Sequence, residues 1–485
     1  MIEIKNLSLA FPGKGKTFDN VSFNIKKNTI TLLSGDSGCG KSSLLMCIAR
    51  VIPQTIEGNI TGEIIYKGSN IEDKGVEVVS GDIGYMFQDP DSQLCTFTVE
   101  DEIAFGLENM NIEPCEMDGI IDEVLKLTGI EHLRKRDLSQ LSGGEKQKVA
   151  LSSILALNPE FILMDEPTAN LDPISTKETI ELIRRLRDDM GKTILLVEHK
   201  VNEFKDIIDE VICFDENGTS KVDKAEFLKS YMERSKLPSR VKVDIEEEPV
   251  VRVEDICFSY DKETDVLKNI NFSLHRKEIA AIIGSNGAGK STLSKILMGL
   301  LKPEKGKIVV NDKDIAKMSP REIGENMGLV FQNPEHQFIK MTVEKEMALS
   351  LELKGKSLHE VSSKVEYYLN LFQLSEHRQM NPFSLSQGQK RRLSTASMLI
   401  NGQPILILDE PTYGQDRENL QKLLKLLYEI NEKGVSILII THDMDLVYSS
   451  CDSYIHLEHG RIVKRGRVDE NFKKNFEKEI DYGGR

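Results

Sequence analysis

The amino-acid sequence predicts an α/β chain of two consecutive domains, each a mainly parallel core sheet with an α-helical subdomain. Three observations lead to this prediction: the same blocks of sequence occur twice, each half contains short uninterrupted apolar runs, and segments with a helical pattern separate those runs. Strands that alternate with helices are typical of parallel α/β sheets. We expect a first domain over residues 1–235, an acidic linker over 236–249 and a second domain over 250–485.

The internal repeat decides the number of domains. The length of 485 residues alone suggests about three domains at roughly 150 residues each. However, six blocks recur in one order at nearly fixed offsets, and chance similarity between two α/β domains would produce one such block but hardly six. We therefore expect two homologous domains. The blocks begin at Ile2 and Val251, Gly35 and Gly284, Phe87 and Phe331, Leu141 and Leu385, Leu163 and Ile407, and His199 and His442.

The apolar runs predict the strands of each core sheet. A continuous apolar run between turn residues is typical of a strand that is buried on both faces, as in a parallel sheet. Several runs end in a residue that can carry chemistry, which predicts a functional edge where the strands end. The runs are 29–33, 161–164 and 193–197 in the first half, and 278–283, 405–408 and 436–440 in the second.

Charge and cysteine usage exclude several classes of protein. The 63 Lys and Arg against 78 Asp and Glu give a balance of −15, so the broad surface is a poor partner for nucleic acid and positive sites must be local. No run of about 18 apolar residues exists to span a bilayer, and residues 1–5 do not begin like a signal peptide. The seven cysteines form no Cys-x-x-Cys pair, which argues against a zinc site or disulfide framework and favours a reducing compartment.

Each half carries a glycine-rich loop of the form G-x-x-x-x-G-K-S between a predicted strand and a predicted helix. The glycines let backbone N–H groups converge on phosphate oxygens, and the helix points its positive end at the same anion. Lys41 and Lys290 would reach the β- and γ-phosphates, while Ser42 and Ser291 would bind Mg²⁺. A plain glycine-rich turn is the alternative, but two copies in this context argue against it. The predicted nucleotide-binding residues are Gly35, Gly38, Gly40, Lys41, Ser42, Ser43, Gly284, Asn286, Gly287, Gly289, Lys290, Ser291 and Thr292.

An acidic pair ends an apolar run in each half and begins the sequence Asp-Glu-Pro-Thr. Asp165 and Asp409, at the tips of strands, would bind Mg²⁺ through water. Glu166 and Glu410 would polarise the water that attacks the γ-phosphate. Such a pair is usually a solvated strand end, but the Pro-Thr that follows both pairs and the repeat itself favour catalysis.

A histidine and an aromatic residue also recur in both halves. His199 and His442 follow a further apolar run, and their matched position after the glutamates favours a γ-phosphate contact over a structural role. Phe11 and Tyr260 precede the two loops by the same interval, so their rings could stack on adenine. Core packing is nearly as good an interpretation for Phe11.

Together these residues resemble the ATP-binding cassette (ABC) family of transporter ATPases, over essentially the whole chain. The specific mark is a signature segment that opens a helix in each half: LSGGE over 141–145 and LSQGQ over 385–389. In that family two cassettes pair head to tail and ATP lies between the loop of one and the signature of the other. The resemblance implies ATP and Mg²⁺ as ligands and ATP hydrolysis as the activity. One composite site would join Lys41, Ser42, Gln88, Asp165, Glu166 and His199 to Ser386 and Gly388; the other would join Lys290, Ser291, Gln332, Asp409, Glu410 and His442 to Ser142, Gly143 and Gly144.

Two departures from the family pattern indicate that the two sites differ. Gln387 stands where the family usually has Gly, and the loop after the second glutamate reads YGQD over 413–416 against ANLD over 169–172. Both sets of catalytic residues are nevertheless complete. We therefore expect two hydrolytic sites that are not equivalent.

Cys39 lies inside the first phosphate-binding loop. A small filler residue is the favoured interpretation. A thiol beside a helix N-terminus can also have a lowered pKa, which would make Cys39 reactive and let thiol reagents block the first site.

A narrower resemblance lies in the segments FQDPDSQ over 87–93 and FQNPEHQ over 331–337, which we call the Gln loops. They are similar to those of energy-coupling-factor ATPases, which drive vitamin and transition-metal uptake in prokaryotes. The resemblance implies that Gln88 and Gln332 bind Mg²⁺ and γ-phosphate and pass the nucleotide state to a groove for the coupling helices of a transmembrane subunit. Pro90 and Pro334 fit the start of a short helix there. The implied partners are integral membrane coupling and substrate-binding components, with this chain on the cytoplasmic face of the membrane.

Three other functions compete with this interpretation. Tandem ATPases of sugar importers usually have one degraded site, whereas both sets are complete here. Soluble tandem ATPases that act on ribosomes or DNA generally add a long basic linker or inserted domains, whereas this linker is short and acidic. A scaffold without turnover is disfavoured by the two complete catalytic sets.

Overall fold

The computed structural model divides the chain into two compact units, Met1–Ser235 and Lys236–Arg485. It describes residues 1–13, 15–36, 38–73, 79, 81–169, 171–215, 218–240, 248–261, 265–413, 415–470 and 472. Most of the acidic linker (241–247), Asn170 and Gly414 lie outside the described residues. Among the described residues, no helix is both long and apolar enough to cross a membrane.

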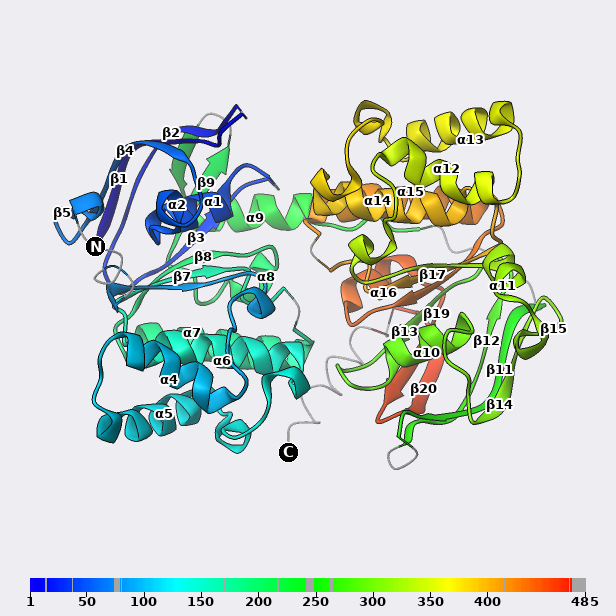
Figure 1. Cartoon of the computed structure of the whole chain (residues 1–485), viewed down its shortest axis with the longest axis horizontal. Coiled ribbons are helices and arrows are strands. Elements are labelled where there is room, and N and C mark those ends of the chain that lie inside the picture. The colour runs from blue at the N-terminus through cyan, green and yellow to red at the C-terminus, as the bar shows by residue number, and fades with distance from the viewer. Residues whose placement is uncertain are drawn as a thin grey trace. The chain divides into compact units, whose positions relative to one another are not determined.

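The first unit contains two sheets (Figure 1), and one buried apolar cluster includes residues of both. A six-stranded sheet of order β10-β9-β3-β8-β7-β6 is parallel except for β10, and an antiparallel sheet of order β2-β1-β4-β5 lies beside it. The strands are β1 (Ile2–Ala10), β2 (Lys16–Ile25), β3 (Ile30–Ser34), β4 (Asn59–Tyr66), β5 (Ser69–Asn70), β6 (Ile83–Met86), β7 (Phe161–Asp165), β8 (Thr193–Val197), β9 (Glu210–Asp215) and β10 (Gly218–Val222). The helices are α1 (Lys41–Ile48), α2 (Val51–Gln54), α4 (Val99–Asn109), α5 (Pro114–Thr128), α6 (Gly143–Ala156), α7 (Pro173–Asp188), α8 (Val201–Phe204) and α9 (Lys224–Arg234).

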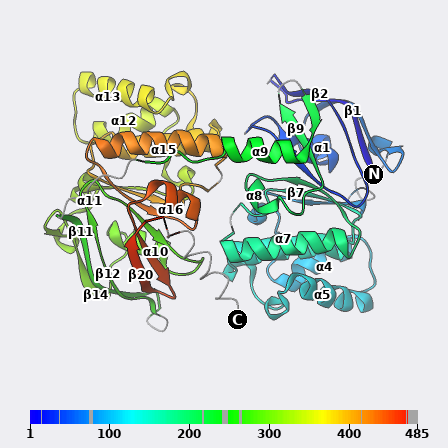
Figure 2. The same cartoon turned by 180° about the vertical axis from the view of Figure 1, so that it is seen from behind.

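The second unit repeats this architecture, with the helical subdomain on one side of the parallel sheet and the antiparallel sheet on the other (Figure 2). Its sheets have the orders β16-β17-β18-β13-β19-β20 and β12-β11-β14-β15, and only β20 runs antiparallel in the first of them. The strands are β11 (Pro249–Ser259), β12 (Asp265–His275), β13 (Ile279–Ile283), β14 (Lys305–Val310), β15 (Lys313–Asp314), β16 (Met327–Val330), β17 (Ile405–Asp409), β18 (Ser436–Ile440), β19 (Ser453–Glu458) and β20 (Arg461–Arg467). The helices are α10 (Lys290–Leu297), α11 (Pro320–Asn326), α12 (Val343–Leu353), α13 (Leu358–Leu371), α14 (Gln387–Leu399), α15 (Arg417–Glu432) and α16 (Met444–Ser450).

The predicted fold class is confirmed, and the sequence explains the layers. The strands β3, β7, β8, β13, β17 and β18 are buried along almost their whole length, as the apolar runs predicted. Each parallel sheet covers one core cluster with its antiparallel partner sheet and a second with the helices of the subdomain. In parallel register, β3, β7 and β8 end at the same edge, and so do β13, β17 and β18, so the loops that follow these strands meet there.

The start of the predicted linker packs on the second unit. The Arg240 guanidinium lies 2.6 Å from the Asp452 carboxylate, and both side chains are buried. The Tyr428 hydroxyl donates to the carbonyl of Pro238 at 2.9 Å. Residues 236–240 are therefore fixed to α15 and the segment around α16 by polar contacts.

Candidate functional site: phosphate-binding loops and acidic strand ends

Each phosphate-binding loop connects a central strand to a helix and turns on glycines. Gly40 and Gly289 directly precede α1 and α10 with φ of 101° and 100°, a region that favours glycine because other residues have a Cβ there. Gly35 and Gly284 pass close to a neighbouring strand, since an added Cβ would stand 2.1 and 2.2 Å from carbonyl oxygens of β9 and β19. These constraints fix the loop around the N-terminus of its helix, the arrangement that suits an anion.

The remaining predicted loop residues lie along the same turns. Gly38 and Gly287 also have positive φ, and Asn286 is exposed. Ser43 and Thr292 occupy the first turns of α1 and α10. The structure therefore brings the predicted set together in each half.

The two loop lysines lie over the loops that contain them. Lys41 Nζ donates to the carbonyls of Gly35 and Asp36 at 2.8 and 2.7 Å. Lys290 Nζ donates to the carbonyls of Gly284 and Ser285 at 2.8 and 3.0 Å. Both side chains are largely buried. One largely buried lysine therefore lies at each loop.

The structure brings the acidic strand ends next to the loop serines. Ser42 hydrogen-bonds to Asp165, and Ser291 to Asp409. Burial, with the neighbouring glutamate adding to it, raises the pKa of each aspartate to about 6.

These buried carboxylates also fit a divalent cation. The Oδ1 atoms of Asp165 and Asp409 are buried without a hydrogen-bond partner among the described residues, and a carboxylate oxygen beside a serine hydroxyl is the hard donor set that Mg²⁺ prefers. No group of three or more His, Cys, Asp or Glu in the described part of the chain could hold a metal. A cation here would therefore also need phosphate oxygens or water.

Each predicted catalytic glutamate contacts the predicted histidine of its own half. Glu166 Oε1 lies 3.1 Å from His199 Nε2, and Gln88 donates to Glu166 Oε2 at 3.0 Å. Glu410 lies 3.1 Å from His442 Nδ1. The structure therefore unites glutamate, histidine and glutamine in the first unit and glutamate with histidine in the second.

The backbone holds both glutamates in an uncommon conformation. Glu166 and Glu410 have φ of 50° and 46°, and their N–H groups donate to the carbonyls of Val197 and Ile440 on the adjacent strand at 2.8 Å. Non-glycine residues with positive φ are uncommon and concentrate at functional sites.

In the first glutamate–histidine pair the shifted pKa belongs to the histidine, and in the second it belongs to the glutamate. Burial lowers the pKa of His199, but the hydrogen bond to Glu166 and its charge outweigh this effect and leave the pKa raised. Burial raises the pKa of Glu410, but the hydrogen bond to His442 and its charge outweigh this effect and leave the pKa lowered. The pairing therefore favours the protonated imidazole of His199 in the first half and the charged carboxylate of Glu410 in the second.

The two signature segments begin helices with a capping box. The amide of Ser142 donates to Glu145 at 2.8 Å, and the amide of Ser386 donates to Gln389 at 2.9 Å. Gln387 is exposed and leaves this cap intact. The departure therefore adds an exposed amide side chain to a helix start that keeps its capping box, with Gln389 in place of Glu145.

The glycines of the signature segments differ in how much space surrounds them. Gly143 has nothing within 4 Å of an added Cβ, so a side chain fits there, as at Gln387. At Gly388 an added Cβ would stand 2.5 Å from Asn419, and at Gly144 it would stand 3.1 Å from Leu171. Packing therefore requires glycine most strictly at 388.

The two predicted adenine-stacking residues have different environments. Tyr260 is 61% exposed, and its hydroxyl lies 3.2 Å from Thr292 Oγ1 in the first turn of α10. Phe11 is partly buried and packs against the core of the first unit. The ring of Tyr260 is thus open to a ligand at the loop. The position of Phe11 instead agrees with the alternative interpretation, that this ring packs in the core.

The reactive-thiol hypothesis for Cys39 is wrong. Burial raises the pKa of this thiol, and the nearby Lys41 ammonium lowers it by less. The filler interpretation fits better, because Cys39 packs with the core of the first unit.

Three side chains at the sites escaped the sequence analysis. Glu198, buried beside His199, accepts hydrogen bonds from Thr168 Oγ1 at 2.6 Å and from the His199 amide at 2.8 Å. The Tyr231 hydroxyl donates to the carbonyl of His199. Arg391 is buried within α14 and reaches the second Gln loop. A carboxylate next to the histidine at the end of an apolar run was the available signal for Glu198.

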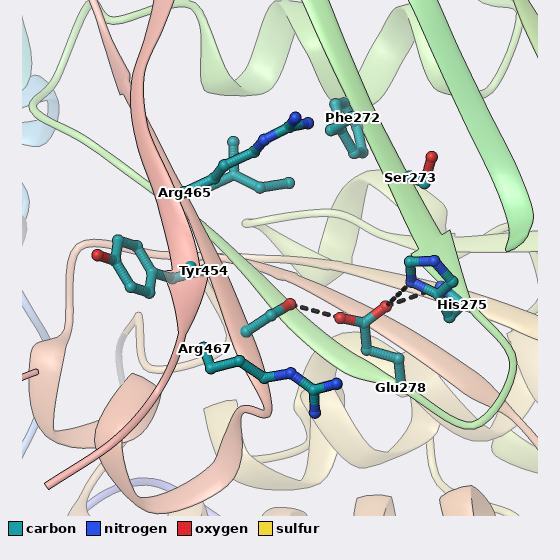
Figure 3. Close-up of a pocket in the computed structure, with 10 residues that line it drawn as sticks. Phe272, Ser273, His275, Glu278, Tyr454, Arg465 and Arg467 are labelled. Carbon is teal, nitrogen blue, oxygen red and sulfur yellow. Dashed lines mark hydrogen bonds and ion pairs between the residues drawn. The ribbon is translucent and has the colours of Figure 1, made fainter. Parts of the chain in front are cut away.

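A cavity of about 510 Å³ in the second unit lies outside the predicted site residues (Figure 3). Its wall includes Arg465, Arg467 and the buried Glu278, whose carboxylate accepts from the His275 amide at 2.7 Å and from Ser453 Oγ at 2.5 Å. Glu278 therefore holds the turn between β12 and β13 and the start of β19.

Comparison with known proteins places both units in one family. The model of the ABC transporter family matches residues 18–169 and 267–413. A relative from Bacillus subtilis, provisionally named HMP/thiamine import ATP-binding protein YkoD, is 37% identical over 495 residues, covering 94% of this chain and 90% of its own. A relative from Saccharolobus solfataricus, provisionally named ABC transporter ATP-binding protein SSO2030, is 35% identical over 518 residues, covering 99% of this chain and 96% of its own.

Two solved structures are also similar to this chain in part of its length or in fold. CbiO1 from Clostridium perfringens, described as part of the ABC transporter complex cbiONQ, is 32% identical with a TM-score of 0.45, covering 49% of this chain and 96% of that one. A model of ribosome-bound archaeal Pelota and ABCE1 gives a TM-score of 0.69 at 20% identity, covering 98% of this chain and 80% of that one. The latter likeness is one of fold alone.

Proposed function

Since the chain belongs to the ABC transporter family, we propose that it is the ATP-hydrolysing subunit of a membrane importer of the energy-coupling-factor type. The chain is a tandem ABC ATPase, with two ATP-binding cassettes that correspond to the two units. The proposed cargo is a vitamin, a vitamin precursor or a transition metal ion. The name of the Bacillus subtilis relative, which refers to HMP/thiamine import, supports the vitamin class.

The observation that carries the importer proposal is the form of the two Gln loops. Each contains a short 3₁₀ helix that begins at its proline, Pro90–Ser92 and Pro334–Gln337. Exposed apolar side chains follow each loop in the sequence: Phe97 is 83% exposed, Ile339 73% and Met341 70%. Apolar groups left in water beside a short helix suit the docking of a partner's amphipathic helix. We assign this role to cytoplasmic coupling helices of a transmembrane subunit.

In the proposed mechanism each glutamate acts as general base. Glu166 and Glu410 orient and polarise the attacking water, with the paired histidines near the γ-phosphate. Lys41 and Lys290 hold the β- and γ-phosphates. Mg²⁺, held by the loop serine, the strand-end aspartate and the Gln-loop glutamine (Ser42, Asp165 and Gln88, or Ser291, Asp409 and Gln332), would neutralise developing charge on the phosphates.

The proposal further includes composite sites between the cassettes. Ser386 and Gly388 would complete the first site, and Ser142, Gly143 and Gly144 the second. The exposed N-termini of α6 and α14 support this assignment, because their N–H groups suit a phosphate. ATP binding would then close the cassettes, and hydrolysis would reopen them and move the membrane partner.

Purification of the tagged chain from detergent-solubilised membranes tests the proposal. We expect integral membrane proteins to co-purify, including a substrate-binding component whose ligand identifies the cargo. The triple variant Phe97→Ser, Ile339→Ser, Met341→Ser should lose them. The matched control is Leu358→Ser, which removes an 86% exposed leucine at the start of α13, and it should retain them. Co-sedimentation with ribosomes in place of membrane partners, or retention by the triple variant, would contradict the proposal.

A further inference from the structure

The second cassette carries a buried arginine that joins its Gln loop to its catalytic glutamate. Arg391, 1% exposed within α14, donates from Nη1 to the carbonyl of Phe331 and from Nη2 to the carbonyl of Gln332, both at 2.6 Å. Nη2 also lies 3.3 Å from the carbonyl of Glu410. One side chain of the signature helix therefore contacts the backbone of both the Gln loop and the proposed catalytic glutamate.

Two further contacts connect the same helix to the same loop. Lys390 Nζ lies 2.6 Å from the carboxylate of Glu335, and Ser394 donates to the side chain of Gln337. Gln337 in turn donates to the carbonyl of Leu329 on β16 at 2.7 Å. The short helix of the second Gln loop is thus fastened to α14 and to its own strand.

The first cassette keeps only one of these three contacts. The repeat places Lys146, Gln147 and Ala150 where the second cassette has Lys390, Arg391 and Ser394, 244 residues later. Lys146 pairs with Asp91 at 2.5 Å, as its counterpart does. Gln147 is 3% exposed, and neither amide atom has a hydrogen-bond partner among the described residues.

The third position and the second glutamine of the first Gln loop also differ. Ala150 has no hydroxyl to donate. Gln93, the counterpart of Gln337, instead accepts from the amide of Phe87 at 3.1 Å, a bond within the loop. Gln93 therefore bonds within the first Gln loop, whereas its counterpart Gln337 bonds to the signature helix.

We propose that Arg391 and Ser394 are positioning residues that make the Gln loop, the Glu410 backbone and the signature helix of the second cassette move as one body. The first Gln loop keeps the Lys146–Asp91 pair but lacks the counterparts of the other two contacts, and therefore moves more independently of its helix. Charge supports a strong contact. Burial lowers the pKa of Arg391 to about 10, so the guanidinium remains protonated at neutral pH, and the Asp409 and Glu410 carboxylates favour that form. Hydrogen bonds from a charged donor to buried carbonyls are stronger than neutral ones.

Hydrogen exchange on the full chain without nucleotide tests this proposal, and it needs neither turnover nor a membrane partner. Peptides over 331–337 should exchange at least about tenfold more slowly than peptides over 87–93. The reason is that hydrogen bonds from a charged donor make local opening of the second Gln loop less favourable. The double variant Arg391→Gln, Ser394→Ala should abolish this difference. Arg391→Lys keeps the charge but loses the two-pronged guanidinium donor. Its exchange over 331–337 should be intermediate between that of the parental chain and that of the double variant. Peptides of α15 should be unaffected, whereas a merely structural role would raise exchange throughout the cassette.

The reciprocal double variant, Gln147→Arg with Ala150→Ser, tests the inference even if the first fails to fold. A cavity of about 330 Å³ beside Gln147, with Met86 and Pro167 in its wall, offers room for the longer side chain. Exchange over 87–93 should slow about tenfold. Equal exchange of the two Gln loops in the parental chain, or no slowing in this variant, would overturn the proposal.

Discussion

The two cassettes carry the same acidic and histidine side chains but hold them differently. In the first, Glu166 contacts Nε2 of His199 and also accepts from the side chain of Gln88. In the second, Glu410 contacts Nδ1 of His442. The histidine rings therefore present different nitrogens to the glutamate. The repeat has preserved the residues proposed to touch nucleotide, while the residues that orient them have diverged.

The residue before each histidine shows the same divergence. Glu198 is a buried carboxylate that accepts hydrogen bonds from three backbone N–H groups, those of Thr168, His199 and Lys200. The second cassette has the neutral Thr441 there, which accepts from the Asp443 amide at 3.0 Å. The first site thus has an additional negative charge behind its histidine, and this charge helps to raise the pKa of His199. Equivalent motifs accordingly do not imply equivalent electrostatics.

Removing both glutamates tests what the cassettes share and has the largest expected effect. The double variant Glu166→Gln, Glu410→Gln should reduce steady-state ATP turnover by about 10²–10⁴-fold, the usual contribution of a general base. Equilibrium binding of ATP should persist because the phosphate-binding loops are unchanged. Turnover near the parental rate would show that the glutamates are not the bases.

Replacing the strand-end aspartates compares the two metal positions. Their folded pKa of about 6 lies above the ordinary value of 3.8, so the stability they contribute is present below about pH 4 and lost as the pH rises through 6. Asp165→Asn and Asp409→Asn should each stabilise the chelator-treated protein at pH 8 by up to about 3 kcal/mol, and less at pH 5. Urea unfolding at both pH values measures this.

Because Asp165 and Asp409 are similarly buried, the two Asn variants should gain similar unfolding free energies. Mg²⁺-dependent ATP binding should fall in both variants, since each loses a proposed ligand. A gain at pH 5 as large as that at pH 8 would contradict the ionisation argument, and a gain in one cassette alone would show that the metal positions differ.

The residues that could be predicted from the sequence are those marked by a local pattern, such as the end of an apolar run. The phosphate-binding loops, Asp165 and Glu166 occur at the ends of apolar runs, and parallel register brings such ends to one edge. The short helices at Pro90 and Pro334 were predicted from another local signal, because proline is favoured at the start of a helix.

The supporting residues were not predictable in this way. Lys390, Arg391 and Arg392 form a basic run, and such a run usually indicates a solvated helix face. All three are buried instead. Their charges are compensated by Glu335 and by carbonyls from distant segments, together with the charge of Asp416 near Arg392. No periodicity in the sequence reports those tertiary acceptors.

Cys39 gives the smallest expected effect and sharpens the comparison of the two loops. Its counterpart in the second loop is Ala288, so Cys39→Ala should change the free energy of unfolding by no more than about 1 kcal/mol and leave ATP turnover nearly unchanged. In the parental protein, iodoacetamide should modify Cys39 more slowly than the exposed Cys115, because burial raises the pKa of Cys39. Mass spectrometry of each alkylated peptide gives both rates, and faster modification of Cys39 would contradict the account.

The residual ATP turnover of the two single glutamate variants tests most directly whether the cassettes are equivalent. In Glu166→Gln the intact site is the one that contains Glu410, which has a lowered pKa and the Arg391 contact. This site is proposed to face the unaltered signature LSGGE. Glu410→Gln leaves the site proposed to face the altered signature LSQGQ. We predict that Glu166→Gln retains the higher rate under identical conditions. Equal residual rates, or the reverse order, would contradict the account.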